Sequence, residues 1–419
     1  MVTSAYIHIP FCRRRCFYCD FAITVIGEKK RGDTSNTMAT YTRTLLKEIA
    51  ATPIYDKRPL KTVFFGGGTP SLLSVTQVEE ILAAIAHRFG IAPNAEITME
   101  MDPATFDLDH IRGYKSAGVN RVSLGVQAFK DELLAAAGRF HRREDIFHAV
   151  ELLRQAGIEN FSLDLILGLP YQVMKDWQAA LIEAITLGPK HLSIYDLIVE
   201  PQTAFSRYYI SGQAPLPSDH LTVEMYRVAR SVLSANGYEH YEICNYAKPS
   251  YASQHNLTYW RCQQNYGFGM GATSYLNHQR IDRPRTQQRY QVWVDAFIQN
   301  GGRTADPVID PEEQVVESIM MGLRLPAGIA LGGVHQIYGE KGLQALGKAI
   351  APHLQNGWLT IKSASVESAS VESALLDDSN AIKLRPTDRI QLSDPEGFLM
   401  SNVVITDAFN ALEDVAHSE

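Results

Sequence analysis

The chain has 419 residues, of which 45% are apolar and 20% are charged, and these values are usual for a globular protein of two or three domains. A formal net charge of −7 argues against nucleic acid as the main partner, although the basic run at residues 13–15 offers a local site for an anion. No apolar run approaches the roughly 18 residues of a membrane span, and we expect no secretory signal. Five cysteines, three of them in one short stretch, suit a reducing compartment, so we expect a cytoplasmic protein that reaches a membrane only through a partner.

Three cysteines follow the apolar run at residues 5–10 with spacings of three and two residues: Cys12, Cys16 and Cys19. An odd number of thiols in so short a loop cannot pair in disulfides of good geometry, so the pattern predicts a ligated metal or cluster. Structural zinc takes four protein ligands, and Cys244 and Cys262 are isolated in the sequence, so zinc is the weaker alternative. An iron–sulfur cluster held by three cysteines leaves one iron open to an exchangeable ligand. The spacing, with Tyr18 before the last cysteine, resembles that of the radical S-adenosylmethionine (SAM) superfamily.

Six strand-like runs alternate with helical patterns, and this alternation is typical of βα units around a parallel sheet. The runs lie at residues 5–10, 61–65, 95–100, 121–127, 161–166 and 191–197. The polar stretch 27–36 predicts a surface loop before a helix that begins near Tyr41. Ser74 and Gln77 form a capping box, which predicts a helix that ends at Gly90. Since six strands are fewer than a closed barrel of this kind needs, the sequence predicts an α/β fold with a partial, laterally open (βα)6 barrel.

Polar or glycine residues follow each predicted strand. In a parallel barrel the carboxyl ends of the strands share one face, so we expect these groups to meet the cysteine loop at one cavity. They are Glu100, Gln127, Asp164 and, after the last strand, residues 200–201. The glycines at 66–68 and the hydroxyl of Thr69 allow close approach to a ligand, and Arg139 is predicted to clamp the SAM carboxylate. Taken singly, each is better explained as a cap, a turn or a surface ion pair, and only their convergence favours a binding site.

Four motifs lie at residues 6–12, 65–71, 118–127 and 164–170. Together they resemble the family of oxygen-independent coproporphyrinogen III oxidase and its relatives, over nearly the whole chain. The resemblance implies that a 4Fe-4S cluster is bound by Cys12, Cys16 and Cys19. It also implies that SAM is surrounded by Tyr6, Tyr18, Gly67, Gly68, Thr69, Glu100, Gln127, Arg139 and Asp164.

Two departures separate the chain from the true oxidases. The cysteine loop comes almost at once, and Asp20-Phe21 stands where those enzymes have Gly-Cys. In both respects the chain is similar to the sister group of HemW-type heme chaperones, so we expect no coproporphyrinogen oxidase activity. The segments 241–247 and 255–260 also match that group, whose His-Asn-x-x-Tyr-Trp element is linked to heme binding.

His255 is the candidate heme ligand that this resemblance implies, since imidazole is a common axial ligand of heme iron. Tyr259 and Trp260 offer aromatic walls for a porphyrin. The alternative is a hydrogen-bonded loop histidine that the same two rings pack against. The glycine-rich segment 267–272 is predicted to be a close-packed turn near the same cavity.

Two domains are predicted, the barrel with its heme-motif extension and a C-terminal domain, at residues 1–300 and 301–419. The second begins with a helix opened by Asp310-Pro311, followed by a second helix and by a strand from Trp358 that pairs with residues 390–398 in a hairpin. This order predicts a helical, winged-helix-like domain, for which the acidic chain and the resemblance favour a lid or docking role over DNA binding. The direct repeat at 363–373 is predicted to be a surface loop within the hairpin, with no function assigned.

Three functions stay open from the sequence. The leading hypothesis is a heme chaperone that carries a 4Fe-4S cluster with exchangeable SAM, binds heme and transfers it to an acceptor protein that the sequence does not identify. The second is a radical SAM oxidoreductase that acts on tetrapyrroles, and the third is a zinc-stabilised barrel without a redox role. None of the three predicts a nucleic-acid partner or a transmembrane segment.

Overall fold

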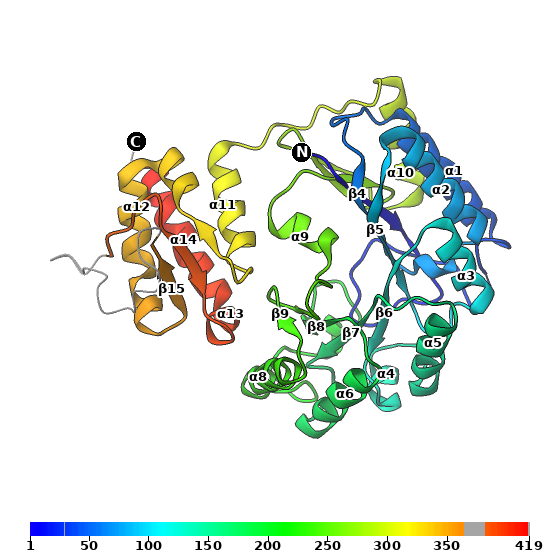
Figure 1. Ribbon diagram of the computed structural model, residues 1–419, viewed down its shortest axis with the longest axis horizontal. Coiled ribbons are helices and arrows are strands. Elements are labelled where there is room, and N and C mark those ends of the chain that lie inside the picture. The colour runs from blue at the N-terminus through cyan, green and yellow to red at the C-terminus, as the bar shows by residue number, and fades with distance from the viewer. Residues whose placement is uncertain (29, 364–381, 418–419) are drawn as a thin grey trace. The chain divides into compact units, whose positions relative to one another are not determined.

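The computed structural model describes residues 1–28, 30–363 and 382–417 (Figure 1). The chain forms two compact units. Unit 1 comprises Met1–Glu239, Cys244–His255 and Gln263–Val308. Unit 2 comprises His240–Ile243, Asn256–Cys262 and Ile309–Glu419.

Unit 1 is built on a sheet whose six central strands are the six that the sequence predicts. They are β1 (Ser4–Ile9), β4 (Leu60–Gly67), β5 (Ile91–Met101), β6 (Arg121–Gln127), β7 (Phe161–Leu167) and β8 (His191–Asp196). These strands pair with one another in parallel, and outer positions are taken by β9 (Glu239–His240), β10 (Asn245–Ala247) and β11 (Tyr266–Phe268). The order is β11-β1-β4-β5-β6-β7-β8-β10-β9, and within the described residues the two end strands do not pair with each other. The predicted partial, open (βα)6 barrel is therefore confirmed.

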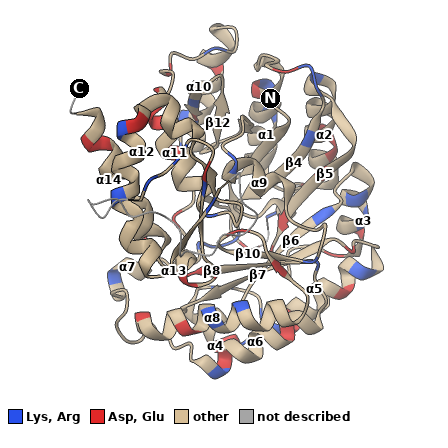
Figure 2. Ribbon diagram, turned by 60° about the vertical axis from the view of Figure 1, so that its left-hand side comes forward, with Lys and Arg blue, Asp and Glu red and all other residues tan. Residues whose placement is uncertain are grey.

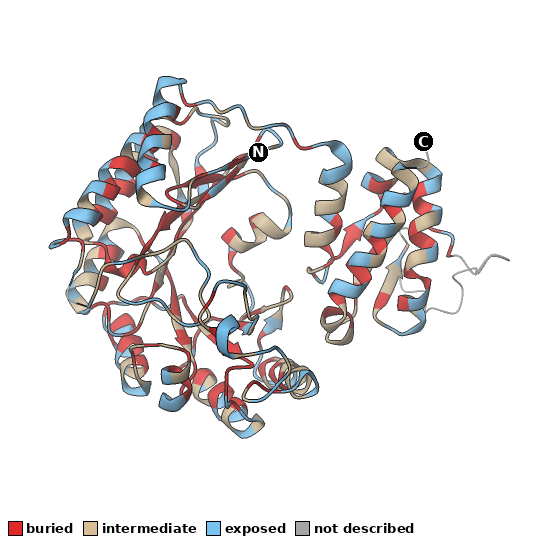
Figure 3. Ribbon diagram, turned by 180° about the vertical axis from the view of Figure 1, so that it is seen from behind, coloured by how far each residue is buried: buried red, intermediate tan, exposed pale blue. Residues whose placement is uncertain are grey.

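Helices follow the strands and cover the outer face of the sheet (Figure 1). They are α1 (Asn36–Ala51), α2 (Val75–Phe89), α3 (Leu108–Ala117), α4 (Asp131–Ala136), α5 (Arg143–Gln155), α6 (Met174–Thr186) and α8 (Asp219–Ala235). The short α7 (Phe205–Tyr208) lies instead against the cysteine loop, where the amide of Phe205 donates a hydrogen bond to the carbonyl of Phe17. Their apolar side chains, such as Leu45 of α1 and Trp177 of α6, are buried, while charged residues gather on the outer helices (Figures 2 and 3). This division between an apolar inner stripe and a polar outer face is what an amphipathic helix on a sheet requires.

Local capping signals decide where two of these helices begin. The capping box before α2 is confirmed, because the Ser74 hydroxyl accepts from the Gln77 amide and the Gln77 side chain accepts from the Ser74 amide. The predicted start of α1 near Tyr41 is wrong by five residues, since the helix begins at Asn36. Ser35 caps α1 by accepting a hydrogen bond from the amide of Met38. The start was missed because Ser35 lies within the polar stretch that was predicted to be a surface loop.

The glycine-rich segment 267–272 begins within β11, which runs parallel to β1, and its residues 269–271 form the predicted turn after that strand. A Cβ at Gly267 would lie 2.2 Å from the carbonyl oxygen of Thr273, and a Cβ at Gly269 would lie 2.4 Å from the Tyr41 hydroxyl. The glycines therefore permit close packing, as predicted, but they do so away from the cavity. The remaining elements of this region are α9 (Gln254–Trp260), β12 (Thr273–Leu276), β13 (Gln279–Asp282) and α10 (Gln287–Gln299).

Unit 2 combines helices with a small antiparallel sheet of order β14-β16-β15. Its elements are α11 (Pro311–Gly322), β14 (Ile329–Ala330), α12 (Gly332–Gln355), β15 (Leu359–Lys362), β16 (Arg389–Leu392), α13 (Glu396–Leu399) and α14 (Ser401–Ala416). Asp310 caps α11 with Pro311 in its first turn, and β15 pairs with β16, so the predicted helix start and hairpin are confirmed. The extension of the hairpin through residue 398 is wrong, because Glu396–Leu399 forms α13.

Apart from Ser363, the direct repeat lies outside the described residues. In the described part of the chain, no helix combines the length and the apolar character that crossing a membrane requires.

Candidate functional site

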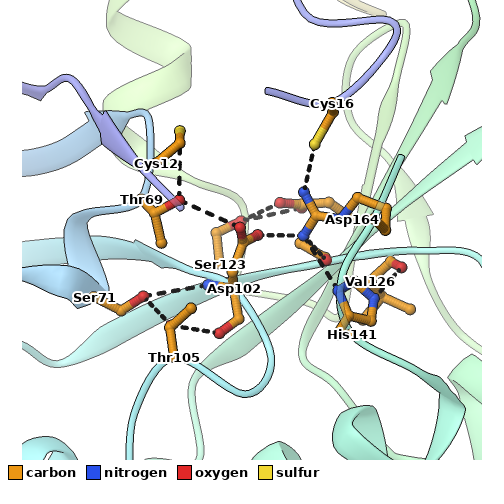
Figure 4. Close-up of polar contacts among 12 residues, drawn as sticks. Cys12, Cys16, Thr69, Ser71, Asp102, Thr105, Ser123, Val126, His141 and Asp164 are labelled. Carbon is orange, nitrogen blue, oxygen red and sulfur yellow. Dashed lines mark hydrogen bonds and ion pairs between the residues drawn. The ribbon is translucent and has the colours of Figure 1, made fainter. Parts of the chain in front are cut away.

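A cavity of about 330 Å³ lies in unit 1 at the carboxyl ends of the central strands. Most of the predicted site residues line it: Cys12, Cys16, Tyr18, Cys19, Gly67, Gly68, Thr69, Glu100, Gln127, Arg139 and Asp164. They come from the ends of four strands, from the loop after β1 and, for Arg139, from the segment after α4, so the topology brings together residues up to 152 positions apart, as Asp164 and Cys12 are. Figure 4 shows part of this set around Asp102.

The cysteine loop begins with β2 (Phe11–Cys12), which pairs with β3 (Thr24–Val25). The Thr69 hydroxyl lies 3.6 Å from the Cys12 sulfur, and Nη1 of Arg139 lies 3.5 Å from the Cys16 sulfur. A Cβ at Gly68 would lie 3.0 Å from the Cys12 sulfur and 2.7 Å from the Phe11 carbonyl, so this position excludes any side chain. Burial raises the pKa of the Cys12 thiol to about 12, so a bound metal is needed to hold its thiolate form.

The arrangement of the thiols fits a cluster better than a single ion. Within the described residues, no three His, Cys, Asp or Glu side chains converge closely enough to hold one metal ion. A structural zinc needs four converging ligands, whereas the cysteines of an iron–sulfur cluster each bind a different iron. Three thiols spread around one cavity are therefore a suitable donor set for a cluster.

Two buried carboxyl groups form one wall of the cavity. Glu100 accepts a hydrogen bond of 2.9 Å from the amide of Gly67, and Asp164 accepts hydrogen bonds of 3.0 and 2.9 Å from the Ser123 hydroxyl. Burial and the neighbouring Asp164 raise the pKa of Glu100 to about 8, and burial also raises the pKa of Asp164. The two carboxyl groups therefore share a site in which both cannot easily be charged.

Arg139 is buried and forms an ion pair with Asp102, and it also donates a 2.9 Å hydrogen bond to the carbonyl of Gly125. Asp102 accepts a further hydrogen bond of 3.3 Å from the Thr69 hydroxyl (Figure 4). Asp102 was not predicted as a site residue, although the Asp102-Pro103 pair that directly follows β5 indicates a polar strand end. At the end of β8, Asp196 lines the cavity, whereas the predicted residues 200–201 do not.

Two predicted residues do not line the cavity. The Tyr6 hydroxyl lies 3.1 Å from Nδ1 of His8, and its ring stacks on Phe64 at 6.0 Å between centroids. His255 is 1% exposed, and its Nδ1 lies 2.8 Å from the Thr62 hydroxyl. Burial and the positive charge of Arg121 lower the pKa of His255 to about 3, so its imidazole is neutral at physiological pH.

The Glu100 carboxyl predicts a pH dependence of stability. Since folding raises its pKa from 4.5 to about 8, the folded chain keeps a proton that the unfolded chain releases in this range, and stability falls as the pH rises through it. We expect the difference in melting temperature between Glu100→Gln and the wild type, both free of cofactor, to shift in favour of the variant as the pH rises from 4.5 to 8. Thermal denaturation at several pH values measures this, with the exposed Glu151→Gln as control. Equal slopes for the wild type and Glu100→Gln would contradict the assignment.

Comparison with known proteins agrees with this site. Residues 6–183 match the family model described as the Radical SAM superfamily, and residues 309–367 match the HemN C-terminal domain. A protein of Synechocystis sp. named heme chaperone HemW is 43% identical over 417 residues, which cover 99% of this chain and 98% of that protein. The chain belongs to the HemW family. A HemW protein of Bacillus subtilis is 37% identical over 80% of this chain and 87% of its own length.

The fold of this chain resembles that of coproporphyrinogen III oxidase (HemN) from Escherichia coli. The match has a TM-score of 0.76 and covers 98% of this chain and 89% of that chain. The sequence identity is 22%, so this likeness concerns the fold alone.

Proposed function

We propose that this protein is a heme chaperone, which binds heme and transfers it to an acceptor protein, and that it carries a 4Fe-4S cluster with exchangeable SAM. The observation that carries the proposal is the 43% identity to a named heme chaperone over almost the full length of both chains. The cavity supports the cofactor part, since it gathers three thiols, glycine backbone, a buried arginine and carboxyl groups. The location in a reducing compartment belongs to the same proposal, because the described cysteines form no disulfide and three of them line the cavity.

Different residues of the chain bind the cluster and SAM. The cluster, when bound to Cys12, Cys16 and Cys19, supplies a one-electron redox centre with one iron open for SAM. Gly67 and Gly68 let the backbone approach SAM. The guanidinium of Arg139, which pairs with Asp102 in this structure, can pair instead with the carboxylate of SAM. The carboxyl groups of Glu100 and Asp164 accept hydrogen bonds from SAM, and the side chains around the cavity exclude water.

A radical SAM oxidoreductase of tetrapyrroles is the second candidate. It shares the cofactor site, so the cavity does not separate it from a chaperone, and its support is the resemblance of the four sequence motifs to oxygen-independent coproporphyrinogen III oxidase and its relatives. The two functions differ in the fate of the tetrapyrrole. A chaperone retains heme and releases it unchanged to an acceptor, whereas the oxidoreductase converts its tetrapyrrole and consumes SAM.

His255 is our candidate for the axial heme ligand, and its contacts define the test. Because its Nδ1 is engaged by Thr62, ligation through this atom requires that hydrogen bond to break. We therefore expect cluster-reconstituted wild-type protein to retain about one heme per chain after anaerobic hemin titration and desalting, with a distinct Soret band. His255→Ala should lose this heme, whereas Thr62→Val, which removes the hydrogen bond to Nδ1 and keeps the imidazole, should retain it.

The matched pair separates ligation from packing. If His255 only packs the sheet, the two variants should lose similar stability and both should retain heme. Heme retention by His255→Ala would remove this residue from the proposal while leaving the chaperone function standing. A wild type that retains no heme and converts coproporphyrinogen in the presence of SAM would favour the oxidoreductase.

A further inference from the structure

The guanidinium of Arg139 makes one contact that the proposed function does not use. Its Nη1 lies 3.5 Å from the sulfur of Cys16, to which it donates a hydrogen bond (the dashed line from Cys16 in Figure 4). The Arg139 side chain is 6% exposed, so little water competes for this contact. An arginine carries five N–H groups and stays charged at every physiological pH, so it can serve several acceptors at once.

The other terminal nitrogen of Arg139 holds the side chain in this position. Its Nη2 forms the ion pair with Asp102, donates a 2.9 Å hydrogen bond to the carbonyl of Gly125 and lies 3.5 Å from Nδ1 of His141. Burial and the positive charge of Arg139 lower the pKa of His141 to about 3, so this imidazole is neutral and can accept. Because Nη1 and Nη2 face different partners, SAM can replace Asp102 at Nη2 while Nη1 stays at the cysteine sulfur.

Asp102, which anchors the guanidinium, is itself fixed by its neighbours. Its amide donates a 3.3 Å hydrogen bond to the Ser71 hydroxyl, and its carbonyl accepts a 2.6 Å hydrogen bond from the Thr105 hydroxyl. These two hydroxyls lie 2.6 Å apart, and both residues are buried (Figure 4). The ion pair also leaves no room for a side chain at Gly125, where a Cβ would lie 2.9 Å from Oδ1 of Asp102 and 3.4 Å from Nη2 of Arg139. The position of the guanidinium is therefore set by its surroundings.

We propose that Arg139 donates a hydrogen bond to the Cys16 sulfur of the bound cluster and thereby raises the reduction potential of the cluster. The inference rests on the proposed function, because it takes the three cysteines as cluster ligands. Reduction adds negative charge that is spread over the cluster and its cysteine sulfurs. A cationic donor to one of these sulfurs therefore stabilises the reduced form more than the oxidised form. Asp102 is a positioning residue, which acts by holding the guanidinium in place.

The test is the reduction potential of the cluster-reconstituted full-length protein without SAM, measured by anaerobic titration with dithionite and electron paramagnetic resonance. We expect Arg139→Met to lower the ratio of reduced to oxidised cluster at a fixed potential about tenfold, which is the effect of losing one charged hydrogen bond. For one electron this is a shift of about 59 mV to a more negative potential. Gly125→Ala changes no charge, but its Cβ displaces the ion pair, so it should shift the potential in the same direction.

Two further variants separate the hydrogen bond from the charge. Arg139→Lys keeps the charge but loses the planar fork that reaches both contacts, so it should also lower the potential. Arg15→Met is the matched control, since Arg15 is an exposed cation of the cysteine loop that donates to the carbonyls of Cys19 and Phe21. The control should keep a potential close to that of the wild type, because water and salt screen an exposed charge.

Three results would overturn the inference. The first is a wild-type potential in Arg139→Met or in Gly125→Ala, since the hydrogen bond would then have no effect on the cluster. The second is an equal shift in Arg15→Met, which would show that any cation of the loop acts in this way. The third is loss of the cluster from both Arg139→Met and Gly125→Ala, which would show that the arginine only supports the loop. A wild type that binds no cluster would instead refute the cofactor part of the proposed function.

Discussion

Single replacements of Cys12, Cys16 or Cys19 by alanine are expected to abolish stoichiometric cluster binding. The wild type reconstituted with iron and sulfide should hold about four irons per chain, and each variant should hold only a small fraction of this. The reason is geometric, because the three thiols lie around one cavity and no other cysteine lines it. Iron and sulfide analysis together with the visible spectrum measures the loss.

Cys244→Ala and Cys262→Ala are the matched controls, since these cysteines are also partly exposed but lie outside the cavity. Both should reconstitute with the iron content of the wild type. If one of them also loses the cluster, the ligand set is wrong and a fourth protein ligand must be sought. If the three loop variants instead retain iron and the wild type binds one zinc per chain, the cluster itself is refuted.

The parts of the structure that sequence predicted well are those that short-range physics controls. The capping box of Ser74 and Gln77 lies within one helical turn, and each strand of the barrel is a short apolar run followed by a turn. The resemblance supplied 11 of the 26 residues that line the cavity, because most of its motifs lie at strand ends. Parallel topology then brought Glu100, Gln127 and Asp164 together without further information.

What sequence did not predict depends on pairs that meet only after folding. The partner of Arg139 is Asp102, which is 37 residues away, and the partner of the His255 imidazole is Thr62, which is 193 residues away. No local pattern assigns such partners, since many residues of the right type compete for each position. The burial of Arg121 belongs to the same class, because a single arginine in a strand-like run looks the same whether it points to solvent or into the barrel.

Another unpredicted pair joins Glu48 of α1 to Arg283, which follows β13, and their side chains are 0% and 1% exposed. Nε of Arg283 donates a 2.8 Å hydrogen bond to Glu48, which also accepts from the amide of Gly269 at 2.9 Å and from the hydroxyl of Tyr290. The carboxylate thus ties α1 to the chain segment that follows β11. Since β11 pairs with β1, this network also holds the strand that leads into the cysteine loop.

Arg283→Met is therefore expected to destabilise the protein by about 3–5 kcal/mol, because it leaves the Glu48 carboxylate buried without its cation. Chemical denaturation of the reconstituted protein measures the change. Lys130→Met is the control, since Lys130 pairs with Asp176 at 3.1 Å but is 47% exposed, and such surface pairs contribute at most about 1 kcal/mol. Adding Glu48→Gln to Arg283→Met should recover part of the loss, since an amide is less costly to bury than an unpaired carboxylate. Equal, small effects of the Arg283 and Lys130 replacements would show that the buried pair does not hold this edge of the sheet.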